Sequence, residues 1–104
     1  MRTERDWKLF RERLPAWQER HMQALLNEYA AIIASDEAPS DRFWKLEAKL
    51  KKDVRNVGVC VEMNRSALFN NLLCLLDKET ITMEDLNGFS VDLKRNLAAL
   101  IEMR

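Results

Sequence analysis

The chain has 104 residues, of which 47% are hydrophobic and 33% charged, a balance typical of one globular domain with a charged surface. Its 17 basic and 17 acidic residues cancel, which argues against strong general attraction to nucleic acid or to anionic lipid. It has no apolar run of about 18 residues, and its first residues lack the apolar core of a secretory signal. We therefore expect neither a membrane span nor secretion.

The sequence contains few turn-forming residues and few cysteines. Two glycines and two prolines predict few, long elements, and abundant Leu, Ala, Glu, Lys and Arg favour helices over strands. Cys60 and Cys74 form neither a disulfide framework nor a metal-ligand pattern, so we expect free thiols in a reducing cytoplasm. The predicted class is all-α, with neither a metal nor a cofactor.

Two helices are predicted in the N-terminal third, over residues 4–13 and 15–34. Thr3 and an acid three residues later resemble a capping box ahead of the first helix, whose apolar residues recur at helical spacing. Pro15 separates the two, because proline disfavours a helical conformation in the residue before it but suits the first turn of a new helix. A single kinked helix over residues 4–34 is the alternative.

A third helix is predicted over residues 41–57, after a loop at 35–40. Ser40 is the expected N-cap. Apolar residues recur every three or four positions along this helix: Phe43, Leu46, Leu50, Val54 and Val57. Residues 59–63 lean towards β structure but have no second strand to pair with, so we expect an extended connector packed on the core.

The most apolar stretch is Ala67–Leu76, in which eight of ten residues are hydrophobic. It lies within a helix predicted over residues 65–78 and capped by Asn64. A helix that is hydrophobic on most sides must be covered on most sides. We therefore expect a compact bundle of four to five helices around this central helix, forming a single domain over residues 1–104.

The C-terminal quarter repeats the capping-box pattern at Thr82 and Asp85. This pattern predicts a short turn near residues 83–87. A longer helix is expected near residues 90–103, with a stripe of leucines towards the core.

No residue pattern in the sequence points to catalysis or to a bound ion. His21 is the only histidine, no cysteine lies at metal-ligand spacing from it, and we expect it to face solvent on a helix. Cys74 lies in the apolar stretch, where a thiol stays protonated and unreactive. The sequence has no glycine-rich phosphate loop. We predict no catalytic residue and no enzyme activity.

The third predicted helix has a basic side, made of Arg42, Lys45, Lys49 and Lys52. With Trp44 as a flanking aromatic, such a strip could follow the phosphates of a nucleic acid. The plainer interpretation is a solvated helix face whose charge is compensated by nearby acids. Nucleic-acid binding is therefore the alternative function.

Four residues are candidates for a protein interface: Trp17, Trp44, Asn70 and Asn71. Tryptophan is favoured in binding hot spots, so an exposed Trp17 or Trp44 would mark an interface, although packing in the core is the default interpretation. Asn70 and Asn71 lie within the apolar stretch. A buried asparagine needs hydrogen-bond partners and can set helix register or the choice of partner.

Three stretches resemble small bacterial all-helical proteins of unknown function: Phe43-Trp44-Lys45-Leu46-Glu47, Met63-Asn64-Arg65-Ser66, and Glu84-Asp85-Leu86 with Phe89-Ser90 and Leu93-Lys94. The resemblance implies a bacterial source and no defined activity, and it identifies no catalytic or ligand-binding residue. The functional hypothesis comes from the residues instead. Many apolar and aromatic residues without a chemical site suggest a non-enzymatic interaction module that associates with itself or with another protein.

Overall fold

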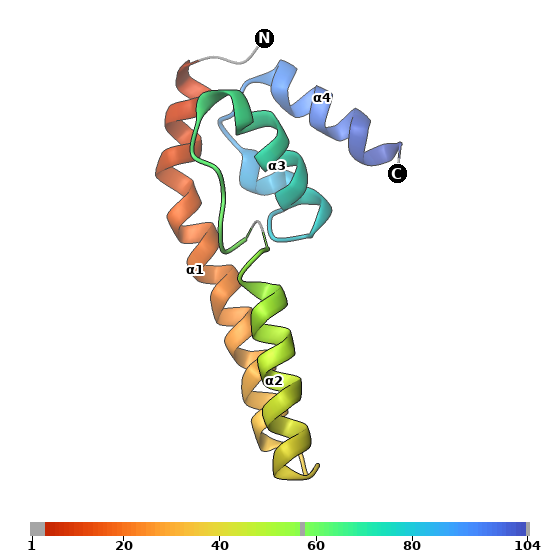
Figure 1. The fold of residues 1–104 in the computed structure, drawn as a ribbon. Coiled ribbons are helices and arrows are strands. Elements are labelled where there is room, and N and C mark those ends of the chain that lie inside the picture. Colours follow the sequence, from red (N-terminus) through yellow and green to blue (C-terminus); the bar gives the residue numbers. More distant parts are fainter. Residues whose placement is uncertain (1–3, 57, 104) are drawn as a thin grey trace.

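The computed structural model describes residues 4–56 and 58–103 (Figure 1). These residues form four α-helices and two short 3-10 helices, and no strand is present among them. The elements in chain order are α1 (Glu4–Ala34), α2 (Pro39–Asp53), η1 (Arg65–Ala67), α3 (Leu68–Asp77), η2 (Met83–Leu86) and α4 (Val91–Glu102). The all-α prediction is confirmed.

The first helix, α1, runs through Pro15 without interruption over 31 residues. The alternative of one helix is therefore right, and the prediction of two separate helices is wrong. A proline inside a helix costs about 3 kcal/mol, because it removes one backbone hydrogen bond and crowds the preceding turn. Phe10 and Leu14 before the proline and Trp17 after it are all buried in the same core. Packing on both sides of Pro15 offsets that cost and keeps the helix continuous.

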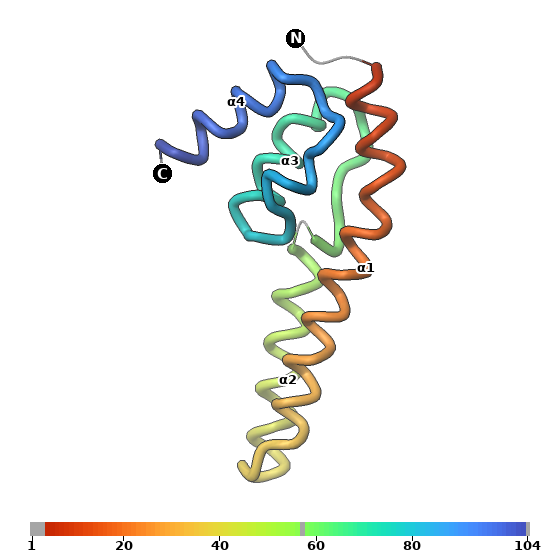
Figure 2. Tube along the Cα trace, turned by 180° about the vertical axis from the view of Figure 1, so that it is seen from behind, coloured from red at the N-terminus to blue at the C-terminus, as the bar shows by residue number. Residues whose placement is uncertain are grey.

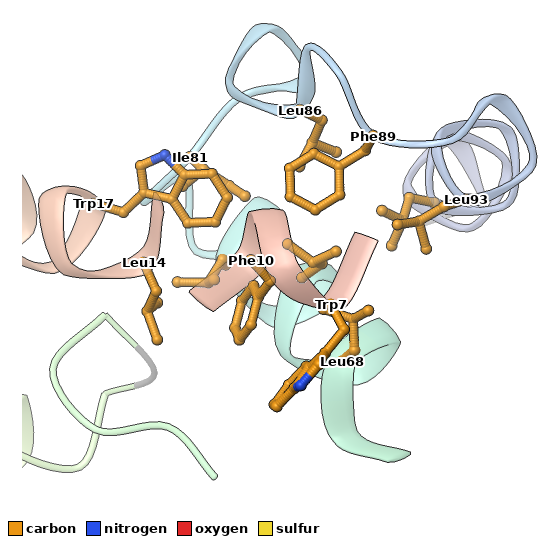
Figure 3. Close-up of a cluster of buried hydrophobic side chains, with 12 residues drawn as sticks. Trp7, Phe10, Leu14, Trp17, Leu68, Ile81, Leu86, Phe89 and Leu93 are labelled. Atoms are coloured by element: carbon orange, nitrogen blue, oxygen red, sulfur yellow. The ribbon is translucent and has the colours of Figure 1, made fainter. Parts of the chain in front are cut away.

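The central helix, α3, lies in what we call the head, formed by residues 4–19 and 60–103. Leu72 and Leu75 of α3 are fully buried, so the prediction of a covered hydrophobic helix is confirmed. Side chains from α1, η2 and α4 surround it (Figure 3). The buried cluster comprises Trp7, Phe10, Leu14, Trp17, Leu68, Leu72, Leu75, Ile81, Leu86, Phe89, Leu93 and Leu97.

Side chains cap the helices of the head as the sequence predicts. Asn64 accepts a hydrogen bond from the Ala67 amide at 2.9 Å. Thr82 and Asp85 form the capping box at the start of η2, where the Thr82 amide donates to the Asp85 carboxylate at 2.9 Å. Both predictions are confirmed, whereas Thr3 lies outside the described residues.

A buried contact between Asp6 and Ser90 joins the first helix to the last. Asp6 is fully buried, and its carboxylate accepts hydrogen bonds from the Ser90 amide at 2.8 Å and from the Ser90 hydroxyl at 2.7 Å. Ser90 is the N-cap of α4. A carboxylate is favourable at a helix N-terminus, so α1 fixes where α4 begins.

The second helix, α2, lies outside the head and packs along residues 20–34 of α1. We call this helical hairpin the arm (Figures 1 and 2). The arm makes the molecule elongated, with extents of 53, 27 and 20 Å. No described residue of α2 belongs to the buried cluster of the head.

The bounds of α2 differ from the predicted helix over residues 41–57. Ala38, rather than Ser40, is the N-cap, because Pro39 occupies the first helical position, which its fixed φ suits. The helix ends at Asp53. The predicted connector then leads along α1 to the head, where Val61 packs against the buried cluster and the Gln18 amide donates to the Val59 carbonyl at 3.2 Å.

Candidate interaction surface

The turn of the arm is held by two basic residues of α2. The Arg42 guanidinium donates to the Ile33 carbonyl at 2.7 Å and to the Glu37 carbonyl at 3.0 Å. A cation there satisfies carbonyls that the end of α1 leaves without helical partners. Lys45 bonds the Glu37 carboxylate at 2.7 Å, and this contact holds the pKa of Glu37 below its usual value. Arg42 and Lys45 therefore stabilise the hairpin itself.

A polar network joins the two helices of the arm. The Tyr29 hydroxyl donates to the Asp53 carboxylate at 2.8 Å, and the Lys49 ammonium lies 2.9 Å from Asp53 and 3.1 Å from Glu28. Burial favours the protonated form of Asp53, but the bonds from Lys49 and Tyr29 outweigh burial and hold the pKa of Asp53 below its usual value. The bond to Asp53 also raises the pKa of Lys49. This network aligns α2 on α1.

One face of the arm exposes large apolar side chains. We call it the apolar face, and it comprises Leu26, Ile33, Phe43, Leu50 and Val54, with Trp44 at its edge. Each of these six residues is between 48% and 63% exposed. The ring centroids of Phe43 and Trp44 lie 5.0 Å apart in an edge-to-face arrangement. Nothing in the described part of the chain covers this face.

The base of the apolar face is hollowed. A cavity of about 210 Å³ opens between the helices, with a lining that is almost entirely apolar. Its walls include Met22, Leu26 and Tyr29 of α1, Leu50 and Val54 of α2, and Val59 of the connector. Because Leu26, Leu50 and Val54 line one hollow, the apolar residues of α1 and α2 belong to the same side of the hairpin.

The four predicted nucleic-acid contacts lie on the opposite flank of α2 from the apolar face. Lys49 marks this flank, where it meets Glu28 of α1. Arg42, Lys45 and Lys49 are all bonded to carbonyl or carboxylate oxygens of the arm, and Lys52 is exposed. A phosphate on this flank would have to compete with those internal partners.

The predicted interface residues fall in different environments. Trp44 is exposed on the arm, and an exposed tryptophan is what we expect of an interface residue. Trp17 is packed in the core of the head between Phe10 and Phe89, as the default interpretation expects. Asn70 is exposed, whereas Asn71 is buried and its amide donates to the Glu62 carbonyl at 2.9 Å. Asn71 therefore ties the connector to α3.

The apolar face is not predicted from the sequence, where Phe43, Leu50 and Val54 indicate only that residues 41–57 form a helix with an apolar side. The side of α2 that faces α1 carries the polar residues Lys49 and Asp53, which bond Glu28 and Tyr29 of α1. The signal present in the sequence was a row of polar residues, Lys49 and Asp53, directly beside the apolar residues Leu50 and Val54 on the same helix.

The expectation that His21 faces solvent is wrong. Its ring is half-buried under Gly58, and its Nε2 atom is buried with no hydrogen-bond partner among the described residues. Gly58 allows the connector to approach this ring, since a Cβ at that position would collide with it. Cys60 is exposed and Cys74 partly buried, and both are free.

Comparisons with models of known protein families, with curated protein sequences and with solved structures found no match to this chain. Within the described residues, no group of three or more histidine, cysteine or acidic side chains is arranged to hold a metal ion. The described helices include none that is both long and apolar enough to cross a bilayer.

Proposed function

We propose that this protein is a non-enzymatic, helical protein–protein interaction module that binds its partner through the apolar face of the arm. The observation that carries this proposal is the concentration of six half-exposed apolar side chains on one side of a hairpin that adds nothing to the core of the head. The largest apolar patch of a typical monomer covers about 300–600 Å² and is often a binding site.

The area of the apolar face is large enough to drive binding. If each of its six side chains exposes on the order of 100 Å², the face offers about 600 Å² of apolar surface. At about 25 cal/mol per Å², covering it returns on the order of 15 kcal/mol before the losses of association are counted. Those losses are about 4–15 kcal/mol, so the area of the face permits binding but does not by itself set the affinity.

In this proposal the module acts in the cytoplasm. Cys60 and Cys74 are both free, which suits a reducing compartment. Their burial differs, since Cys60 is exposed and would be open to oxidation outside such a compartment.

Nucleic-acid binding by the basic flank of α2 ranks second. Three of its four cations already hold the hairpin together, so binding a phosphate there would weaken contacts that stabilise the arm. The apolar face has no such competing partner in the described chain. Salt-dependent binding of DNA or RNA, weakened by reversing the charges of Lys45, Lys49 and Lys52, would favour this second function.

Site-specific photo-crosslinking inside the native cells tests the proposal. A photoreactive residue replaces Leu50 on the apolar face, and in a matched control it replaces Lys52 on the basic flank of the same helix. Both positions are exposed, so neither change disturbs the core. We expect covalent adducts with protein from position 50 and few from position 52. Equal or negligible yields at both positions would contradict the proposal, and adducts with nucleic acid from position 52 would support the second function.

A further inference from the structure

The apolar face is two helices wide and regularly spaced. Leu26 and Ile33 are seven residues apart on α1, and Phe43 and Leu50 are seven residues apart on α2, so each pair lies two turns apart on one side of its helix. Leu26 and Leu50 line the same hollow, which places the two pairs on one side of the arm. The Lys49–Glu28 ion pair lies on the other side.

We propose that the partner bound by the apolar face is a second copy of this chain, so that two arms pack face to face across a twofold axis as a four-helix bundle. This inference rests on the proposed function and names its partner. A face formed by two antiparallel helices matches another such face, and the seven-residue spacing on both helices is the repeat that bundles use. A single helix of another protein would cover the groove between α1 and α2, but it would leave the side chains at the outer edges of the apolar face exposed to solvent.

The area of the paired faces is sufficient for a dimer. Two faces of about 600 Å² each bury about 1,200 Å² in total, which is the lower end of the range for stable interfaces. Interfaces at the low end of this range are typical of transient complexes, so we expect the dimer to exchange with monomer on dilution, which agrees with a chain whose head has its own core.

Glu47 decides how the two arms are oriented. It is exposed and lies on α2 between Phe43 and Leu50, near the middle of the face. If the two α2 helices lay over each other, the two Glu47 carboxylates would be opposed, and opposed like charges are unfavourable. With α2 of each copy over α1 of the other, Glu47 instead meets the uncharged side of α1 around Ala30. In that orientation the turns of both arms lie at the same end of the bundle.

Solution mass measured over a range of concentrations tests the identity of the partner. We expect wild-type protein to show twice the mass of the chain at about 100 µM and to dissociate on dilution. The double variant Leu26→Glu/Leu50→Glu should raise Kd by at least about 100-fold, because it places four carboxylates in the paired faces. Both leucines are about half exposed, so the variant should fold, which circular dichroism checks. The matched control Ala31→Glu/Lys52→Glu changes exposed residues off the apolar face and should leave the mass unchanged.

Crosslinking at the turn tests the orientation. Asp36→Cys places a thiol in the exposed turn, Cys60→Ser removes the exposed native thiol, and Cys60→Ser alone is the control. A short bismaleimide should join two copies through position 36. With α2 over α2 the turns would lie about 20 Å apart, the length of α2, and no crosslink would form.

The possible results separate this inference from the proposed function. A wild-type protein that stays monomeric at about 100 µM overturns the second copy as partner. A dimer that remains intact in the Leu26→Glu/Leu50→Glu variant also overturns the proposal that a second copy binds the apolar face. In either case, heterologous adducts from position 50 would still support an interaction module, for instance one that binds a single amphipathic helix. Absence of both the dimer and the adducts would overturn both proposals. A dimer dissolved by the double variant but not crosslinked at position 36 overturns the orientation.

Discussion

Replacing Gly58 by alanine should destabilise the junction between head and arm, because the added methyl group has no room. A Cβ built on Gly58 would lie 2.6 Å from Cγ and 2.8 Å from Nε2 of His21, far inside normal contact distance. The imidazole that blocks it belongs to α1 and is half-buried, so it cannot move away freely. Overpacking of this kind costs about 1–3 kcal/mol. We expect Gly58→Ala to lower the free energy of unfolding by about 2 kcal/mol.

A double-mutant cycle with His21→Ala isolates the steric contribution. Once the ring is gone, Gly58→Ala should cost less than about 0.5 kcal/mol, which leaves a coupling energy of at least about 1 kcal/mol between the two positions. Gly88→Ala is the control, since Gly88 has a φ of 94° and its replacement should cost the same with or without His21.

Urea unfolding of the four proteins, followed by far-ultraviolet circular dichroism, measures the cycle. An equal cost of Gly58→Ala in both backgrounds would refute the steric reasoning. The loss would then have to come from the backbone freedom of glycine at this position.

Three polar contacts lead to further predictions. The pKa of Asp53 is lowered, so its stabilisation is complete above about pH 3.9, the usual aspartate value, and is lost as the pH falls through the folded value. Asp53→Asn should therefore flatten the acid-side fall in melting temperature, and parallel curves for variant and wild type would count against this assignment. Asp6→Ala should cost about 2–4 kcal/mol, because the Ser90 amide and hydroxyl lose their buried hydrogen-bond acceptor. Amide exchange in the first turn of α4 should then accelerate, and unchanged exchange would show that Asp6 does not hold this turn. Asn71→Ala should cost about 1–2 kcal/mol and loosen the connector at Glu62. Unaltered exchange in residues 60–63 would contradict that role.

The caps of η1 and η2 were determined by short-range sequence. Asn64 and the Thr82–Asp85 pair act on backbone amides no more than three residues away, so the sequence alone identifies them. The burial of α3 was also predictable, because a helix that is apolar on most sides has no stable exposed arrangement in water.

The continuity of α1 depended on tertiary structure. Proline preference favoured a break before Pro15, but buried side chains on both sides of the proline pack into one core. Contacts with residues from α3 and α4 provide that stabilisation, and no pattern within α1 reports them.

The position of α2, and with it the candidate site, was also a matter of tertiary structure. Its sequence period identified one apolar stripe, made of Phe43, Leu46, Leu50, Val54 and Val57, and Trp44 was a candidate interface residue if exposed. In the fold, α2 contacts α1 through a polar network around Asp53, while Phe43, Leu50 and Val54 of the stripe are exposed to solvent. A sequence period tells which side of a helix is apolar. Whether another helix covers that side depends on contacts between residues far apart in the chain, and these form only when the whole chain is folded.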